Sequence, residues 1–154
     1  MLAYTAILRG DVMTSNTGSR ATGLAHIQID PQRKLVSLSL DVDGIALNGL
    51  WDNLVRAPIG PIHLHLYGGQ DHADPSSVSL VFPAPFGPSY ASTKTGFQVR
   101  VADFSYVEGA GLLRSNVTFE DFLAALDAGR VVVNVHTNAF HDGEISGAVT
   151  RDRR

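Results

Sequence analysis

Two histidines separated by one residue are the clearest chemical signal in this sequence. His63 and His65 lie in GPIHLHLYGG, residues 60–69, where they alternate with aliphatic residues. Side chains two positions apart on a β-strand point to the same side of the sheet. The aliphatic residues would therefore face the interior, and both imidazoles would leave the opposite face. Such a pair can bind one metal ion if another strand supplies a third ligand.

A second strand-like segment offers that third ligand. In RVVVNVHT, residues 130–137, alternate valines form one face, whereas Asn134 and His136 lie on the other. If this strand neighbours the first, three imidazoles can meet. Imidazole suits copper, zinc, nickel and Fe(II), and the lack of a carboxylate cage disfavours Ca²⁺. We therefore predict a metal site at His63, His65 and His136, for copper first and zinc as the alternative.

The remaining histidines are weaker candidates for metal ligands. His72, in the loop GGQDHADP, and His141, in the turn AFHDGE, are additional candidate ligands. An isolated histidine is more commonly a surface or hydrogen-bonded residue, and this is our interpretation of His26. The alternative role for His136 is a hydrogen bond to nearby backbone that would hold the hairpin turn.

Short strands separated by turns must position these residues. Apolar patterns predict strands at 4–10, 21–31, 34–44, 62–67, 78–82, 97–107, 130–137 and 144–151. Three prolines predict a long surface loop over 83–96. Residues 45–58 suit either a short helix or an irregular loop. In TFEDFLAALDAG, apolar residues recur with helical spacing after the N-cap candidate Thr118, which predicts a helix at about 118–128.

These elements define the expected fold class. About seven or eight strands without a repeat or βαβ alternation predict an all-β protein. We expect an antiparallel Greek-key or immunoglobulin-like β-sandwich with one short helix (about 118–128). Residues 1–154 would form a single domain, which suits a chain of 154 residues.

Composition excludes other classes of protein. The formal net charge of −3 argues against a broad nucleic-acid interface, and the lack of cysteine excludes disulfides and thiolate sites. No stretch approaches the roughly 20 apolar residues of a membrane span. The opening MLAYTAILRGDV has no basic n-region, so it is not expected to be a signal peptide.

Three segments resemble the chordin-type (CHRD) domain family. GPIHLHLYGG is similar to that family's AHIHxG strand and turn, residues 118–137 to its helix and NVHT strand, and NAFHDGEISGAV to its closing PGGEIRGQ hairpin. The resemblance implies a β-sandwich with immunoglobulin-like or Greek-key wiring in an extracytoplasmic module, periplasmic or secreted. It places the family's motif histidines at His63, His65 and His136, and it implies no catalytic activity.

Three functions remain open from the sequence. The first is a copper-binding sandwich for metal sequestration, delivery or redox chemistry. The second is a non-enzymatic module that binds a protein, a glycan or a second copy of the chain through loops 68–77 and 83–96. The third is an enzyme, either a copper redox enzyme or a hydrolase with a metal-bound water. Because no G-x-S-x-G nucleophile elbow is present, we rank the enzyme third, and we place metal binding first, close to the interaction module.

Overall fold

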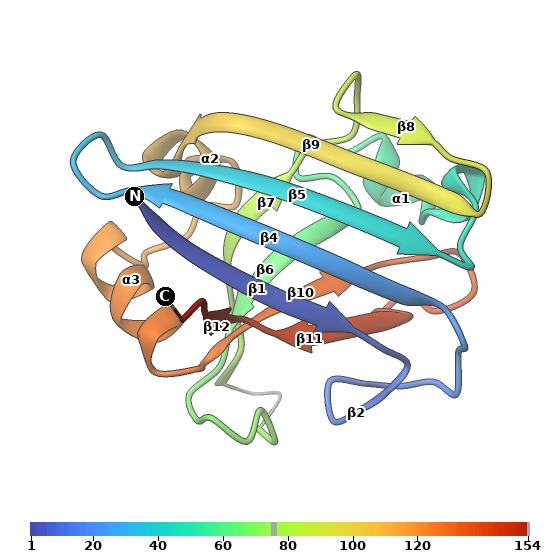
Figure 1. Ribbon diagram of the computed structural model, residues 1–154, viewed down its shortest axis with the longest axis horizontal. Coiled ribbons are helices and arrows are strands. Elements are labelled where there is room, and N and C mark those ends of the chain that lie inside the picture. The colour runs from blue at the N-terminus through green and yellow to red at the C-terminus, as the bar shows by residue number, and fades with distance from the viewer. Residues whose placement is uncertain (75–76, 154) are drawn as a thin grey trace.

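The computed structural model describes residues 1–74 and 77–153 and places most strands in two antiparallel sheets that enclose the core (Figure 1). The larger sheet has the order β12 (Thr150–Arg151), β1 (Leu2–Leu8), β4 (Thr22–Asp30), β5 (Leu35–Asp43), β9 (Gly96–Ser105) and β8 (Tyr90–Ser92). The smaller sheet has the order β11 (Ile145–Ala148), β10 (Val131–Val135), β6 (Ile62–Leu66) and β7 (Ser79–Ala84). A separate hairpin consists of β2 (Asp11–Val12) and β3 (Ser15–Asn16). The predicted antiparallel β-sandwich is confirmed.

The hydrophobic core lies between the two sheets, and one face of each long strand supplies it. Along β4, buried and exposed residues alternate, and Ala25, Ile27 and Ile29 are buried as the sequence pattern predicts. The smaller sheet contributes residues such as Ile62 and Val133 to the same core. This alternation is the expected pattern for antiparallel sheets that cover one core.

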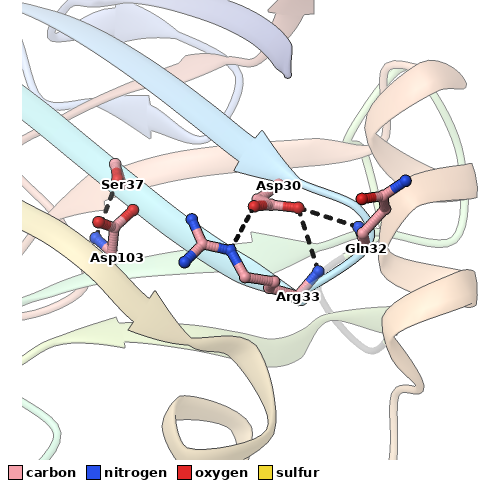
Figure 2. A network of polar contacts seen from close by, with 5 residues as sticks. All are labelled: Asp30, Gln32, Arg33, Ser37 and Asp103. Atoms are coloured by element: carbon pink, nitrogen blue, oxygen red, sulfur yellow. Dashed lines mark hydrogen bonds and ion pairs between the residues drawn. The ribbon is translucent and has the colours of Figure 1, made fainter.

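Polar contacts hold the end of the larger sheet where β4 turns into β5 (Figure 2). Asp30 Oδ1 accepts hydrogen bonds from the backbone N–H groups of Gln32 and Arg33 at 3.0 and 3.1 Å, and Arg33 Nε donates to Asp30 Oδ2 at 2.8 Å. Farther along β5, the Asp103 N–H donates to Ser37 Oγ at 3.0 Å, next to an irregularity in the β5–β9 register. These contacts fix the turn and the alignment of three adjacent strands.

Helices connect the strands at the ends of the sandwich. They are η1 (Leu47–Gly49), α1 (Asp52–Val55), α2 (Tyr106–Leu112) and α3 (Phe119–Asp127). The last of these is the helix predicted at about 118–128, and Thr118 Oγ1 accepts from the Asp121 N–H at 3.1 Å as its N-cap. The segment 45–58 contains η1 and α1, so it is partly helical. Of the helices in the described part of the chain, none is long and apolar enough to cross a membrane.

The prediction of one loop over 83–96 is wrong. The strand β7 continues to Ala84, and β8 forms at Tyr90–Ser92 and pairs with β9. Proline is compatible with β7 because this strand lies at the edge of the smaller sheet, where one side of the backbone needs no ladder hydrogen bond.

The helix α2 was not predicted, although the sequence carries a signal for it. Ser105 Oγ accepts from the Glu108 N–H at 3.2 Å, which is the Ser-x-x-Glu spacing typical of a capping box. Two glycines within the helix, Gly109 and Gly111, lower its intrinsic propensity. The helical pattern is therefore weak, and the preceding strand pattern extends into it.

Candidate metal centre

Pairing of β6 with β10 brings the three predicted ligands to one face of the smaller sheet. In the antiparallel register Asn134 lies opposite His63, so His63, His65 and Asn134 share a side. His136 comes directly after β10, and its backbone N–H donates to Pro61 O at 2.9 Å. This hydrogen bond extends the alignment of the two strands by one position and holds His136 beside the pair.

The three imidazoles form a close cluster. Ring nitrogens of His63, His65 and His136 lie within 4.8 Å of one another. The ring centroids are 5.0 Å apart for His63 and His136, 5.7 Å for His65 and His136, and 5.9 Å for His63 and His65. Nitrogens bound to one tetrahedral ion at ordinary bond lengths are about 3.4 Å apart. The ligand nitrogens would therefore have to approach one another by up to about 1.4 Å to share one ion.

The cluster is buried although it lies on the face opposite the hydrophobic core. The exposed fractions of His63, His65 and His136 are 3, 7 and 8 %. Ile62 and Leu64 belong to the core between the sheets, so the predicted alternation is correct for β6. The second face is nevertheless covered as well, and the sequence pattern did not indicate this.

Four ring nitrogens of the cluster lack hydrogen-bond partners within the protein. Both nitrogens of His63, Nε2 of His65 and Nε2 of His136 are buried and make no hydrogen bond to protein atoms. Buried polar atoms are paired in the great majority of cases, and each unpaired one costs about 1–3 kcal/mol. Several such nitrogens that face one another are therefore the arrangement expected of ligands to a metal ion.

Burial also fixes the protonation state of the cluster. Loss of solvent, with the neighbouring imidazoles adding to it, lowers the pKa of His63 to about 3 and that of His65 to about 4. The pKa of His136 is likewise lowered by burial, against the opposing effect of its hydrogen bond to the His141 carbonyl. All three rings are thus neutral at pH 7, which is the form that binds metals.

The tautomer of His136 follows from its surroundings. Its Nδ1 lies 2.7 Å from the backbone carbonyl oxygen of His141. A carbonyl oxygen only accepts hydrogen bonds, so Nδ1 carries the proton and Nε2 carries the free lone pair. The turn is therefore held by His136, as in the alternative role considered from the sequence, while Nε2 remains available as a ligand.

The structure does not bring His141 and His72 into the cluster. The ring of His141 stacks on Trp51, with 4.1 Å between centroids and 9° between planes, and the hydrogen bond from His136 is accepted by the backbone carbonyl of His141. His72 Nε2 lies 2.9 Å from Gly129 O, and the ring meets Tyr67 edge-on, so His72 holds its loop against the end of α3. In that loop, residues 75 and 76 lie outside the described part of the chain.

Asn134 and Trp51 are neighbours of the cluster that are not among the predicted ligands. Asn134 is 2 % exposed, and its Oδ1 has no partner in the protein, while Nδ2 donates to Asp142 O at 3.3 Å. Trp51 supports His141 and is the only tryptophan of the chain. The sequence already places Asn134 on the same strand face as His136, two residues before it, but nothing in the irregular segment around Trp51 points to the site.

Comparison with known proteins identifies the family. No curated protein sequence matched this chain significantly. The family model described as CHRD domain matches residues 4–149, a span that includes nearly the whole chain and all three histidines of the cluster. This confirms the resemblance seen in the segments around His63 and His136, so the chain belongs to the CHRD domain family.

Proposed function

We propose that this protein binds copper through His63, His65 and His136. The observation that carries the proposal is a group of buried imidazoles from two paired strands whose facing nitrogens have no partner in the protein. A metal ion would use these lone pairs and remove the cost of leaving them unpaired. The rings are neutral at pH 7, so no proton has to leave before an ion binds.

Copper is the preferred ion because of the donor set. Three imidazoles suit copper and zinc, and among divalent ions copper binds such nitrogen sites most tightly. Within the described residues, no carboxylate belongs to the cluster, and calcium and magnesium require oxygen ligands. Zinc is the alternative occupant, and it would need a fourth ligand to complete a tetrahedral site.

The cellular role we propose is copper sequestration or delivery in an extracytoplasmic compartment. The closed position of the ligands favours holding an ion over exposing it to substrate, because each imidazole is less than a tenth exposed. The compartment rests on the family resemblance. Redox use of the bound copper is a further possibility within the same proposal.

The direct test is metal loading of the purified protein. The protein is incubated with copper with and without ascorbate under nitrogen, desalted, and analysed for metal by mass spectrometry. We expect one copper per chain for the native protein, and a loss of affinity of more than about a hundredfold for His63→Ala and His136→Ala, since each removes one of three ligands.

Two matched histidine variants serve as controls. His26→Ala removes an exposed imidazole on the larger sheet, and His141→Ala removes a ring but keeps the carbonyl that accepts from His136 Nδ1. Both should retain one copper per chain. Copper loading that survives His63→Ala and His136→Ala, or that disappears in His26→Ala, would contradict the proposed site.

A further inference from the structure

Asn134 is a neutral side chain on the face of the cluster. A site built for a divalent ion could have a negatively charged side chain at this position. Asn134 lies opposite His63 in the strand register and two residues before His136, on the face that holds the cluster. Its side chain is buried, and Oδ1 makes no hydrogen bond within the protein. The amide packs against Gly143, where an added Cβ would lie 1.9 Å from Oδ1. The absence of a side chain at Gly143 therefore leaves the space that the Asn134 amide occupies, although its oxygen has no hydrogen-bond partner.

The proposed ligand set itself contains no charged side chain, and among the described residues the carboxylate of Asp142 acts on it from outside by opposing the burial that lowers the pKa of His136. Imidazole binds a metal ion in its neutral form, and in the described chain no aspartate or glutamate belongs to the cluster. The energetic cost of transferring an ion from water into a low-dielectric interior grows with the square of its charge, so it is about four times larger for a divalent than for a monovalent ion. A buried divalent ion is normally compensated by anionic ligands, which this cluster does not provide.

The number of ligands also favours a monovalent over a divalent ion. Zinc sites in proteins are almost always four-coordinate, and Cu²⁺ prefers at least four ligands in a tetragonal arrangement. Cu⁺, which is monovalent and has a filled d shell, is commonly stable with three. The cluster offers one ligand from each of three histidines. A divalent ion would have to draw an additional ligand, such as hydroxide, into a site that is almost closed to solvent.

From these observations we infer that the site selects Cu⁺ over Cu²⁺, and that the neutral side chain of Asn134 is a determinant of this selectivity. The inference rests on the proposed copper site and adds the oxidation state of its ligand. An aspartate has nearly the same shape as asparagine and would place a negative charge on the strand face that carries the cluster, with an oxygen in place of the Nδ2 that donates to Asp142 O. That charge would lower the cost of burying a divalent ion more than the cost of burying a monovalent one.

The test compares two oxidation states of the same element. Affinity for Cu⁺ is measured under nitrogen by competition with bathocuproine disulfonate, and affinity for Cu²⁺ by competition with nitrilotriacetate. For the native protein we expect Cu⁺ to bind more tightly than Cu²⁺ by at least about a hundredfold. For Asn134→Asp we expect that ratio to fall by at least about tenfold.

Asn138→Asp is the matched control. It makes the same chemical change four residues away at an exposed position, and it keeps an oxygen that can accept from the Asp52 N–H. Its ratio should equal that of the native protein. Circular dichroism shows whether Asn134→Asp folds, and the native ratio tests the selectivity even if that variant does not fold.

The outcomes separate this inference from the proposed function. Equal or tighter binding of Cu²⁺ by the native protein overturns the selectivity and leaves the copper site standing. A folded Asn134→Asp variant with an unchanged ratio overturns the role of Asn134. If neither ion binds, the proposed function itself fails, and the selectivity fails with it.

Discussion

The metal-free cluster places buried nitrogen lone pairs next to one another, which is an unfavourable local arrangement. Neutral imidazoles at centroid distances of 5.0–5.9 Å do not form hydrogen bonds with each other here. Protonation would relieve the unpaired nitrogens, but burial opposes it and lowers the pKa of each ring. The copper ion that we propose would resolve both problems because it would use the lone pairs directly. The same residues therefore link metal binding, protonation and stability.

The pH dependence of stability follows from these residues. Unfolded histidines protonate near pH 6.5, whereas the folded rings of His63 and His65 stay neutral until about pH 3 and about pH 4. Below pH 6.5 the unfolded chain therefore binds more protons than the folded one, and the free energy of unfolding falls as the pH falls. We expect each histidine to contribute a loss of up to about 1.4 kcal/mol per pH unit.

Urea unfolding of the metal-free protein at pH 7 and pH 5 measures this loss. The His63→Gln, His65→Gln double variant replaces two titrating rings with side chains that do not titrate, so its stability should depend less on pH. A native protein that is equally stable at both pH values, or a double variant with the same slope, would show that the rings are not held neutral by burial.

Among the elements, α2 shows how closely a short helix is fitted to the sandwich. This helix contacts the edge strand β7, and its two glycines have different surroundings. A Cβ on Gly109 would lie 2.6 Å from Phe82 Cε1 and 3.1 Å from Pro83 Cδ, whereas a Cβ on Gly111 would meet nothing within 4 Å. The first glycine is needed for close packing and the second is not.

Alanine substitutions at the two glycines should have opposite effects on stability. Gly109→Ala should lower the free energy of unfolding by about 1–3 kcal/mol, because the buried Phe82 and Pro83 must move. Gly111→Ala should raise it by about 0.5–1 kcal/mol, because alanine favours the helix and meets open space. Denaturant titration of both variants checks this pair, and equal effects of the two substitutions would mean that α2 does not pack on β7 as described.

At the scale of the whole molecule, the proposed copper ion would bridge β6 and β10 and would therefore affect the stability of the whole fold. These strands are the central pair of the smaller sheet, and the segments that hold them are far apart in the sequence. An ion bound only by the folded protein stabilises it in proportion to the logarithm of its concentration above Kd. Bound copper should thus raise the free energy of unfolding of the whole domain and not only the local stability around the site.

Thermal unfolding measures this coupling. At free copper about one hundred times Kd, the expected stabilisation is about 2.7 kcal/mol. For a chain of this size that corresponds to a rise in Tm of about 5–10 °C. Calorimetry under nitrogen, with Cu⁺ and then with an excess of chelator, should show the rise and its reversal. The same rise in His63→Ala would indicate binding elsewhere on the molecule.

Much of the architecture could be predicted because the residues of a strand alternate between two faces, and the face toward the core carries apolar side chains. The pattern of valines and histidines assigned His63, His65 and His136 to faces, and the helical spacing after Thr118 located α3. Both properties are local, with periods set by backbone geometry. The helix α2 and the strand β8 were missed because their glycines, prolines and short lengths weaken such periodic patterns.

Only the tertiary structure decided how separate segments are placed relative to one another, because the alternation along a single strand carries no information about its neighbours. The sequence by itself determined which side of each strand carries an imidazole. It did not determine that β6 pairs with β10, that Asn134 lies opposite His63, or that the face of the cluster is covered. These features depend on chain reversals and packing between residues about seventy positions apart, whose energies are summed over the whole fold.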